Sequence, residues 1–221
     1  MAILRVLESE AGIDPAATCA FVAGHSLGEY SALVAARALG LVDAARLLKT
    51  RGLAMQQAVP VGEGAMTALL GADLEMAREI AAEATDGAPA GEVCVLANDN
   101  APGQVVLSGS KTAIDRAVAL AGEKGVRKAV LLPVSAPFHC PLMAPAAEIM
   151  AKALATVDMQ PPAIPVFANV SAKPVHEPDD IRSLLEAQVT AMVRWRECVA
   201  AMRADGVELL VEAGAGNALK T

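Results

Sequence analysis

Apolar positions in the first 62 residues switch between two spacings, and each switch marks the boundary of an element. Consecutive apolar residues predict a buried strand, whereas apolar positions that recur every three or four residues predict a helix. Gly12 and Gly40 follow helical segments, and Asp43 is a typical N-cap. The predicted order is a helix over residues 2–9, a strand over 19–23, a helix over 29–39 and a helix over 43–58.

Between residues 64 and 132 the pattern becomes strand–helix–strand–strand–helix–strand. A turn at 98–103, rich in Asn, Asp, Pro and Gly, separates the two central strands. The predicted ranges are a strand over 65–70, a helix over 73–84, strands over 93–97 and 104–107, a helix from 111 to 124 and a strand over 129–132. This order is the split, ferredoxin-like arrangement. We therefore expect residues 63–132 to form an inserted ferredoxin-like subdomain.

The remaining sequence returns to an alternation of strands and helices. The predicted elements are a helix over 142–154, a strand over 165–169, helices over 179–189 and 195–203, a strand over 208–212 and a strand-to-helix turn at 214–217. Together with residues 19–23 this gives three strands, which is few for a sheet covered by helices on both faces. We expect residues 1–62 and 133–221 to form one α/β core with an incomplete parallel sheet and flanking helices.

Composition excludes several classes of protein. The 221 residues are 54% hydrophobic and 19% charged, which indicates a folded domain with a substantial core. A net charge of −7 and an aromatic content of 2% argue against nucleic-acid binding. No apolar run is long enough to span a membrane, and the charged first ten residues resemble neither a signal nor a transit peptide. The four cysteines lack zinc-site spacing, so we expect a cytoplasmic protein with reduced thiols and no metal.

Residues 24–29, Gly-His-Ser-Leu-Gly-Glu, lie between a predicted strand and a predicted helix, so Ser26 falls on a G-x-S-x-G elbow. Such a turn holds the serine in strained geometry, and the following helix directs N–H groups and its positive dipole end toward a developing oxyanion. This context favours a nucleophile. The alternative is a glycine-bracketed turn with a capping serine, since five-residue patterns recur by chance.

Arg51 lies on the apolar face of the helix predicted over 43–58, the face that Leu47 and Met55 share. A guanidinium in that position needs an anion, because a buried unpaired charge is costly. An internal carboxylate is one candidate. The nearby elbow favours the other, a substrate carboxylate held by two hydrogen bonds.

His139 lies in a rigid loop between prolines, before the helix predicted over 142–154. A histidine held in this way can act as general base for Ser26, although it can equally be satisfied within its own loop. His25 is next to the serine but on the opposite side of the chain, where we expect a supporting role. His176 has charged neighbours, and we expect it to be exposed to solvent.

Together these segments resemble the malonyl-CoA:acyl carrier protein transacylase family, the acyltransferases of bacterial fatty acid biosynthesis. The resemblance covers essentially the whole chain and depends on six features in order. They are residues 24–29, Arg51, residues 100–109 (N-A-P-G-Q-V-V-L-S-G), residues 135–139, Gln188 with residues 193–195, and the closing Gly214-x-Gly216. The resemblance implies an α/β-hydrolase-like core with a ferredoxin-like subdomain. The subdomain agrees with the order of strands and helices that the pattern between residues 64 and 132 predicts.

The resemblance also implies a role for each matched residue. Ser26 would be the nucleophile and His139 its base, and the backbone carbonyl of Gln188 would orient the imidazole in place of a triad acid. Arg51 would bind the malonyl carboxylate, and the Leu27 N–H would supply one oxyanion donor. Leu27 and Phe138 are also similar to the forms that accompany malonyl rather than methylmalonyl selection.

The implied partners are malonyl-CoA, as substrate, and acyl carrier protein, which brings its own phosphopantetheine. No permanently bound cofactor, nucleic acid or membrane is implied, and we expect a monomer. Carrier protein is acidic, so its docking calls for a local basic patch on this acidic chain. The candidates are Lys124 with Arg127 and Lys128, and Arg194 with Arg196, although a solvated face explains any single one of them.

The sequence departs from the family pattern in ways that leave two alternatives open. The family's opening strand and G-Q-G-x-Q loop, whose glutamine gives a second oxyanion contact, have no match here, nor does its C-terminal tail. Met192 stands where a proline is usual. We therefore expect a chain truncated at both ends, and one lost oxyanion donor costs on the order of 100-fold in rate or more. The alternatives are an inactive fragment that only binds carrier protein, and a serine hydrolase or thioesterase whose acid is Asp73, Asp99 or Asp115.

Overall fold

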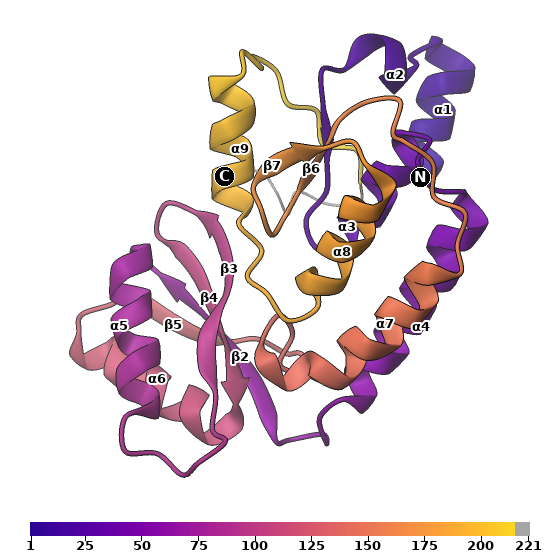
Figure 1. Cartoon of the computed structure of the whole chain (residues 1–221). Helices are drawn as coiled ribbons and strands as arrows, with labels where there is room; N and C mark the ends of the chain where they lie inside the picture. Colours follow the sequence, from indigo (N-terminus) through magenta and orange to yellow (C-terminus); the bar gives the residue numbers. More distant parts are fainter. Residues whose placement is uncertain (215–221) are drawn as a thin grey trace.

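The computed structural model describes residues 1–214, which form an α/β structure with two sheets (Figure 1). A three-stranded sheet has the order β1-β6-β7, and a four-stranded sheet has the order β3-β4-β2-β5. The helices are α1 (Ala2–Ala11), α2 (Pro15–Thr18), α3 (Gly28–Ala35), α4 (Leu41–Gln57), α5 (Leu74–Thr85), α6 (Lys111–Glu123), the 3-10 turn η1 (Pro141–Met143), α7 (Ala144–Ala155), α8 (Pro178–Gln188) and α9 (Trp195–Ala204). The strands are β1 (Val22–Ala23), β2 (Gly64–Leu70), β3 (Cys94–Ala101), β4 (Gln104–Ser110), β5 (Lys128–Leu131), β6 (Val166–Ala168) and β7 (Lys173–Val175).

The three-stranded sheet is mixed rather than wholly parallel. β1 and β6 run parallel, with Val22 opposite Val166, whereas β6 and β7 are antiparallel. The sequence missed β7, because three residues that include Pro174 carry almost no strand signal. The strand predicted over 208–212 is wrong, since these residues belong to no helix or strand. A strand needs a neighbour to complete its hydrogen-bonded ladder, and none of the described strands pairs with this exposed segment.

Four helices build the core beside this sheet. α3, α4, α7 and α8 share a hydrophobic cluster whose largest fully buried members include Tyr30, Leu33, Met55, Met150 and Leu185. The predicted helices over 29–39, 43–58, 142–154 and 179–189 are present with shifted ends. The N-cap of α4 is Gly40, and Asp43 lies in the first turn, where its carboxylate accepts a hydrogen bond from Arg46.

The four-stranded sheet is antiparallel and follows the predicted order of elements, β2-α5-β3-β4-α6-β5. α5 and α6 pack on the sheet through a second hydrophobic cluster that includes Leu69, Ile80, Leu107 and Ile114. The predicted turn at 98–103 is wrong for its first four residues, since β3 continues through two register shifts to Ala101. Polar residues inside a bulged strand imitate a turn signal, because a bulge breaks the regular alternation.

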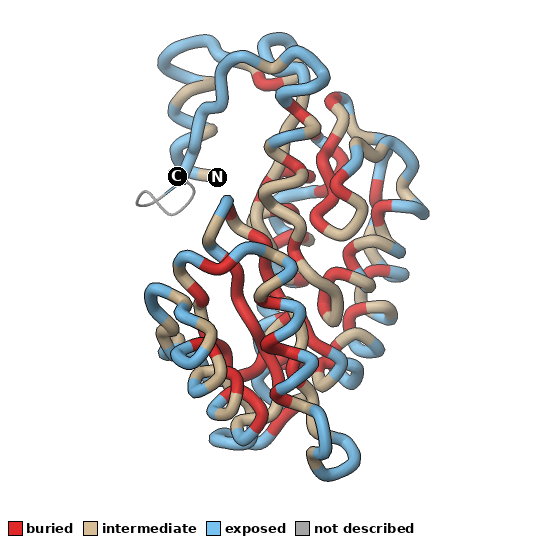
Figure 2. The backbone as a smooth tube through the Cα atoms, turned by 90° about the vertical axis from the view of Figure 1, so that its left-hand side faces the viewer, coloured by how far each residue is buried: buried red, intermediate tan, exposed pale blue. Residues whose placement is uncertain are grey.

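The two ends of the described chain are largely exposed. α1 has no buried residue, and Figure 2 draws its tube without the colour of buried positions. Gly12 ends this helix in the left-handed conformation with φ of 65°, as the sequence predicts. The predicted turn at 214–217 lies outside the described residues beyond Gly214. Over the described range, no helix is both long and apolar enough to cross a bilayer.

Candidate active site

Ser26 lies between β1 and α3 in a left-handed backbone conformation, with φ of 53°. Few residues other than glycine adopt this conformation, and they are held in it by their surroundings, often at functional sites. Gly24 permits the turn, because a Cβ there would lie 2.0 Å from the carbonyl carbon of Gly28. A Cβ on Gly28 would meet no described atom within 4 Å. The strained elbow predicted from the sequence is therefore present, and Gly24 is the glycine that it requires.

Asn169 fixes the elbow from the neighbouring strand, a contact that the sequence analysis missed. Its Oδ1 accepts a hydrogen bond of 2.7 Å from the Ser26 N–H, and its Nδ2 donates to the Gly24 carbonyl at 2.8 Å. Asn169 directly follows β6, which is parallel to β1. Sites of α/β sheets lie at the carboxyl ends of parallel strands, so the position of this asparagine at a strand end was a usable signal.

His139 is buried and touches Ser26 directly. Its Nε2 lies 2.8 Å from Ser26 Oγ, and its Nδ1 lies 2.8 Å from the backbone carbonyl of Gln188. Because a carbonyl only accepts, Nδ1 carries the proton and Nε2 accepts from the serine hydroxyl. Burial, and after it the positive charge of Arg51, lowers the pKa of His139 to about 3. The free site therefore holds a neutral imidazole that is able to take a proton.

Arg51 reaches the same serine from the buried face of α4. Its Nη2 donates to Ser26 Oγ at 3.0 Å and to Gln188 Oε1 at 3.1 Å, while its Nε has no partner among the described residues. Burial lowers the pKa of this guanidinium from its ordinary value. The internal carboxylate that the sequence left open is not in contact, since no ion pair to Arg51 occurs within residues 1–214. The guanidinium is thus free to pair with an anion brought by a ligand.

Glu29 is a second group that the sequence analysis did not single out as part of the site. Its Oε2 accepts hydrogen bonds from the Asn169 N–H at 3.0 Å and from Gln188 Nε2 at 2.8 Å. Burial raises the pKa of this carboxyl to about 7, and its hydrogen bonds and the charge of Arg51 oppose the rise in part. A charged residue in the first turn of a buried helix is a signal that could have marked it.

Two other predicted residues are the sequence neighbours of Ser26 and His139. Leu27 is the N-cap of α3, and the described residues offer no acceptor for its backbone N–H, which leaves this donor available beside Ser26. Its side chain is 58% exposed. Phe138 immediately precedes His139 and packs against the hydrophobic clusters of both the helical core and the four-stranded sheet.

The other two histidines stand apart from the proton path. His25 Nε2 lies 2.8 Å from Asn100 Oδ1, and the imidazole ring makes a tilted contact with Trp195. Burial lowers the pKa of His25. His176 is exposed, as the sequence predicts. His25 therefore connects the elbow to β3 and α9. The sequence gave no sign of its contact with Asn100.

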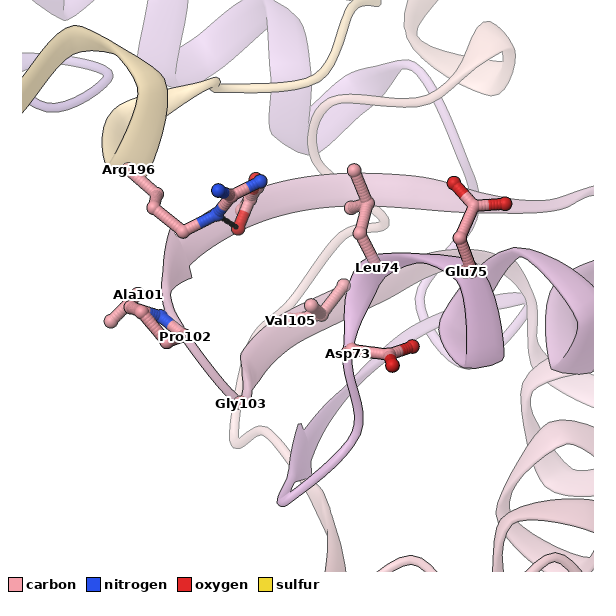
Figure 3. Close-up of a pocket in the computed structure, with 9 residues that line it drawn as sticks. Asp73, Leu74, Glu75, Ala101, Pro102, Gly103, Val105 and Arg196 are labelled. Carbon is pink, nitrogen blue, oxygen red and sulfur yellow. Dashed lines mark hydrogen bonds and ion pairs between the residues drawn. The ribbon is translucent and has the colours of Figure 1, made fainter. Parts of the chain in front are cut away.

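The three aspartates that a hydrolase triad would need are engaged elsewhere. Asp73 caps α5 by accepting from the Met76 N–H at 2.8 Å, and Asp115 pairs with Lys111. Asp99 is buried and forms an ion pair of 2.7 Å with Arg196. This pair borders a surface cavity of about 430 Å³ between α5, the β3–β4 turn and α9 (Figure 3). The residues that line it include neither Ser26 nor its hydrogen-bond partners Asn169, His139, Arg51 and Gln188.

Most of the basic residues considered for docking have acidic partners. Lys124 pairs with Glu83, Arg194 with Glu197, and Arg196 with Asp99. Arg127 and Lys128 are exposed, and the described residues show no ion pair for either. Within residues 1–214 there is also no group of three side chains suited to hold a metal ion.

Comparison with known proteins gives consistent matches over nearly the whole chain. The family model described as an acyl transferase domain matches residues 2–219. A malonyl CoA-acyl carrier protein transacylase from Haemophilus influenzae is 48% identical over 90% of this chain and 62% of its own length. The Bacillus subtilis protein of the same name is 44% identical over 98% of this chain and 67% of its own.

Solved structures agree with these matches. An acyl-carrier-protein-S-malonyltransferase from Bartonella henselae superposes with a TM-score of 0.94 at 50% identity, covering 99% of this chain and 68% of that one. A malonyl-transacylase solved with a type II PKS acyl-carrier protein gives a TM-score of 0.92 at 40% identity, covering 99% of this chain and 67% of that one. The chain thus spans 62% to 68% of the length of these relatives.

Proposed function

The chain belongs to the acyl transferase family, among the malonyl-CoA:acyl carrier protein transacylases, and from this we propose that it is an S-malonyltransferase. It would move a malonyl group from CoA to the phosphopantetheine thiol of acyl carrier protein through a malonyl-serine intermediate. The observation that carries the proposal is the convergence on one atom: Ser26 Oγ lies 2.8 Å from His139 Nε2 and 3.0 Å from Arg51 Nη2. A nucleophile, a base and a fixed cation therefore meet at one point.

In the first half-reaction, His139 Nε2 takes the hydroxyl proton as Ser26 Oγ attacks the thioester carbonyl. The Leu27 N–H donates to the developing oxyanion. The Gln188 carbonyl accepts from Nδ1 and so stabilises the imidazolium that forms. When the tetrahedral intermediate collapses, the carbon–sulfur bond breaks, and the CoA sulfur leaves with the proton from Nε2.

The second half-reaction reverses these roles with a different thiol. The phosphopantetheine thiol gives its proton to His139 Nε2 and attacks the malonyl-serine carbonyl. The ester bond breaks, and Ser26 Oγ recovers the proton from the imidazolium. The imidazole begins neutral in both halves, in keeping with the lowered pKa of His139, and the hydrogen bond from Nδ1 to the Gln188 carbonyl favours the imidazolium that each proton transfer forms.

Arg51 would select the acyl group. Once Ser26 is acylated, its Oγ becomes an ester oxygen and a weaker acceptor, so Nη2 can turn to the malonyl carboxylate, with the unpartnered Nε as a second donor. A monocarboxylic acyl group would leave this buried cation without an anion, which is costly. The site therefore favours a dicarboxylic acyl group.

Partner and architecture complete the proposal. We infer that the four-stranded unit is the ferredoxin-like subdomain, residues 63–132, and that the rest is an α/β-hydrolase-like core. Arg127 and Lys128 support docking of the acidic carrier protein on this subdomain, because both are exposed and no acidic side chain within residues 1–214 pairs with them. Free thiols at all four cysteines support a reducing, cytoplasmic setting, and the oligomeric state we propose is a monomer.

A transfer assay tests the proposal against both alternatives. Purified chain, malonyl-CoA and holo carrier protein are mixed, and the mass of the carrier protein is followed, with Ser26→Ala and His139→Gln as controls. We expect malonyl-carrier protein with the wild type and none with Ser26→Ala. Release of malonate as fast as transfer, with no thiol present, would identify a hydrolase. Carrier-protein binding without any acylation would identify a binding fragment.

A further inference from the structure

The proposed mechanism leaves one buried ionisable group of the elbow without a role. Glu29 is 2% exposed, and no cation contacts it directly within the described residues. Two N–H donors converge on its Oε2, one from the Asn169 backbone and one from the Gln188 side chain. Because both donors use the same oxygen, Oε2 acts as an acceptor whether or not the carboxyl is protonated on Oε1.

This contact is the shortest of those that fix which way the Gln188 amide points. The amide nitrogen faces Glu29 and also donates to the Ser26 carbonyl at 3.2 Å, so the amide oxygen faces Arg51 Nη2 at 3.1 Å. If the amide were reversed, its oxygen would face the Glu29 oxygen and its nitrogen would face a guanidinium that only donates. Glu29 accepts the shortest hydrogen bond of this amide nitrogen and so favours, with the Ser26 carbonyl, the orientation in which Arg51 meets an acceptor rather than a second donor.

Gln188 contacts His139 through its backbone and Arg51 through its side chain. Its backbone carbonyl accepts from His139 Nδ1, while its side-chain oxygen accepts from Arg51. The main chain can therefore keep the base in place even when the side chain is changed. This separation makes the position of the cation testable independently of the base.

We propose that Glu29 is a positioning residue that acts through the Gln188 amide to hold Arg51 where the carboxylate of the acyl group must bind. Glu29 thus sets the preference for malonyl over acetyl groups without touching either one. This inference depends on the proposed malonyl transfer, since it assigns the carboxylate of that substrate to Arg51.

The test uses binding rather than turnover, in the full chain with Ser26→Ala so that no acyl transfer occurs. Dissociation constants for malonyl-CoA and acetyl-CoA are measured by calorimetry with and without Glu29→Met, which removes the acceptor oxygen. We expect malonyl-CoA binding to weaken about tenfold, with acetyl-CoA binding unchanged, since a lost charge-assisted hydrogen bond has this size of effect. Glu29→Gln keeps an oxygen for both donors and should restore the preference.

A double-mutant cycle shows whether the two residues act as one unit. Gln188→Met keeps the carbonyl that holds His139 but removes the amide, so it should produce the same loss as Glu29→Met. The two changes together should produce no greater loss than Gln188→Met alone, because they break one chain of contacts. Should Glu29→Met fail to fold, Gln188→Met still tests whether the contacts that run from Glu29 through the Gln188 amide to Arg51 set the preference. Glu92→Met removes a carboxylate in the loop before β3, where it pairs with Arg116 of α6, and should leave the preference intact.

The possible outcomes distinguish a failure of the proposed malonyl transfer from a failure of the role proposed for Glu29. A Ser26→Ala chain with no preference for malonyl-CoA would contradict the proposed function itself. A preference that survives Glu29→Met in a folded chain, or that survives Gln188→Met, would overturn the role of Glu29 alone. Equal weakening of malonyl-CoA and acetyl-CoA binding would also overturn it, because that result indicates general damage to the elbow.

Discussion

Replacing Arg51 by methionine should change the choice of acyl group far more than it changes the basic chemistry. On the buried face of α4, a methionine fills much of the space of the arginine side chain, but it carries no charge and no hydrogen-bond donor. The structure gives Arg51 Nη2 two acceptors, at 3.0 and 3.1 Å, and no carboxylate partner among the described residues. The anion that completes the site is therefore expected from the substrate.

The size of the effect follows from these contacts. A charge-assisted hydrogen bond is worth about 1.5–3 kcal/mol, so losing the one to the malonyl carboxylate should lower kcat/KM for malonyl-CoA roughly 10- to 100-fold. Acetyl-CoA has no carboxylate to lose, and its kcat/KM should hold or rise. Removing the guanidinium should also raise the pKa of His139, because its charge is the second cause of the low value after burial.

The assay is single-turnover acylation of Ser26, quenched and measured by mass for each of the two thioesters. The ratio of malonyl to acetyl rates should fall by at least tenfold in the variant. Arg51→Lys, which keeps the charge but not the paired donors, should fall between the wild type and Arg51→Met. If the two thioesters lost rate in parallel, Arg51 would act on the nucleophile alone, and the carboxylate site would have to be placed elsewhere.

Two further predictions concern the elbow and its buried ionisable groups. Gly24→Ala should destabilise the chain by about 2 kcal/mol or more and abolish acylation, because its Cβ would lie 2.0 Å from the Gly28 backbone. Gly28→Ala is the control: its Cβ would meet open space, so the midpoint of its urea unfolding should equal or exceed that of the wild type. Stability should also depend on pH with two opposed slopes. The pKa of His139 falls from 6.5 to about 3 on folding, so between these values only the unfolded chain binds that proton and stability rises with pH. The pKa of Glu29 rises from 4.5 to about 7, so the folded chain binds the extra proton and stability falls with rising pH over that range. Urea unfolding from pH 4.5 to 6.5 should therefore show that the stability of Glu29→Gln rises with pH more steeply than that of the wild type, by about 1.4 kcal/mol per pH unit; parallel profiles would refute the raised pKa of Glu29.

The parts of the site that lie close together in the chain could be predicted from local patterns. Ser26 stands on a turn whose strand, glycine and helix are consecutive, and Arg51 attracts attention because it interrupts an apolar helix face. The proline-flanked loop marks His139 in the same way. Gln188 gave no such signal, and only the family resemblance indicated it, because an imidazole can be oriented by any carbonyl that the fold brings near.

The contacts that the sequence analysis missed depend on distant segments meeting. Asn169 binds the Ser26 N–H across 143 positions of the chain, and Gln188 reaches Glu29 across 159. No periodicity records such a meeting. The errors in the fold have a related cause: residues 208–212 have the apolar content of a strand but join neither of the two described sheets, and β7 forms beside β6 although its own residues favour no strand. Pairing, rather than composition, decides both.

The central claim is that Ser26 carries the malonyl group. Its most direct test is the intact mass of the purified chain after mixing with malonyl-CoA, compared with Ser26→Ala under the same conditions. We predict a gain of one malonyl group on the wild type and no gain on Ser26→Ala. A wild-type chain that unfolds cooperatively on heating yet gains no mass, or an adduct that persists in Ser26→Ala, would contradict the account.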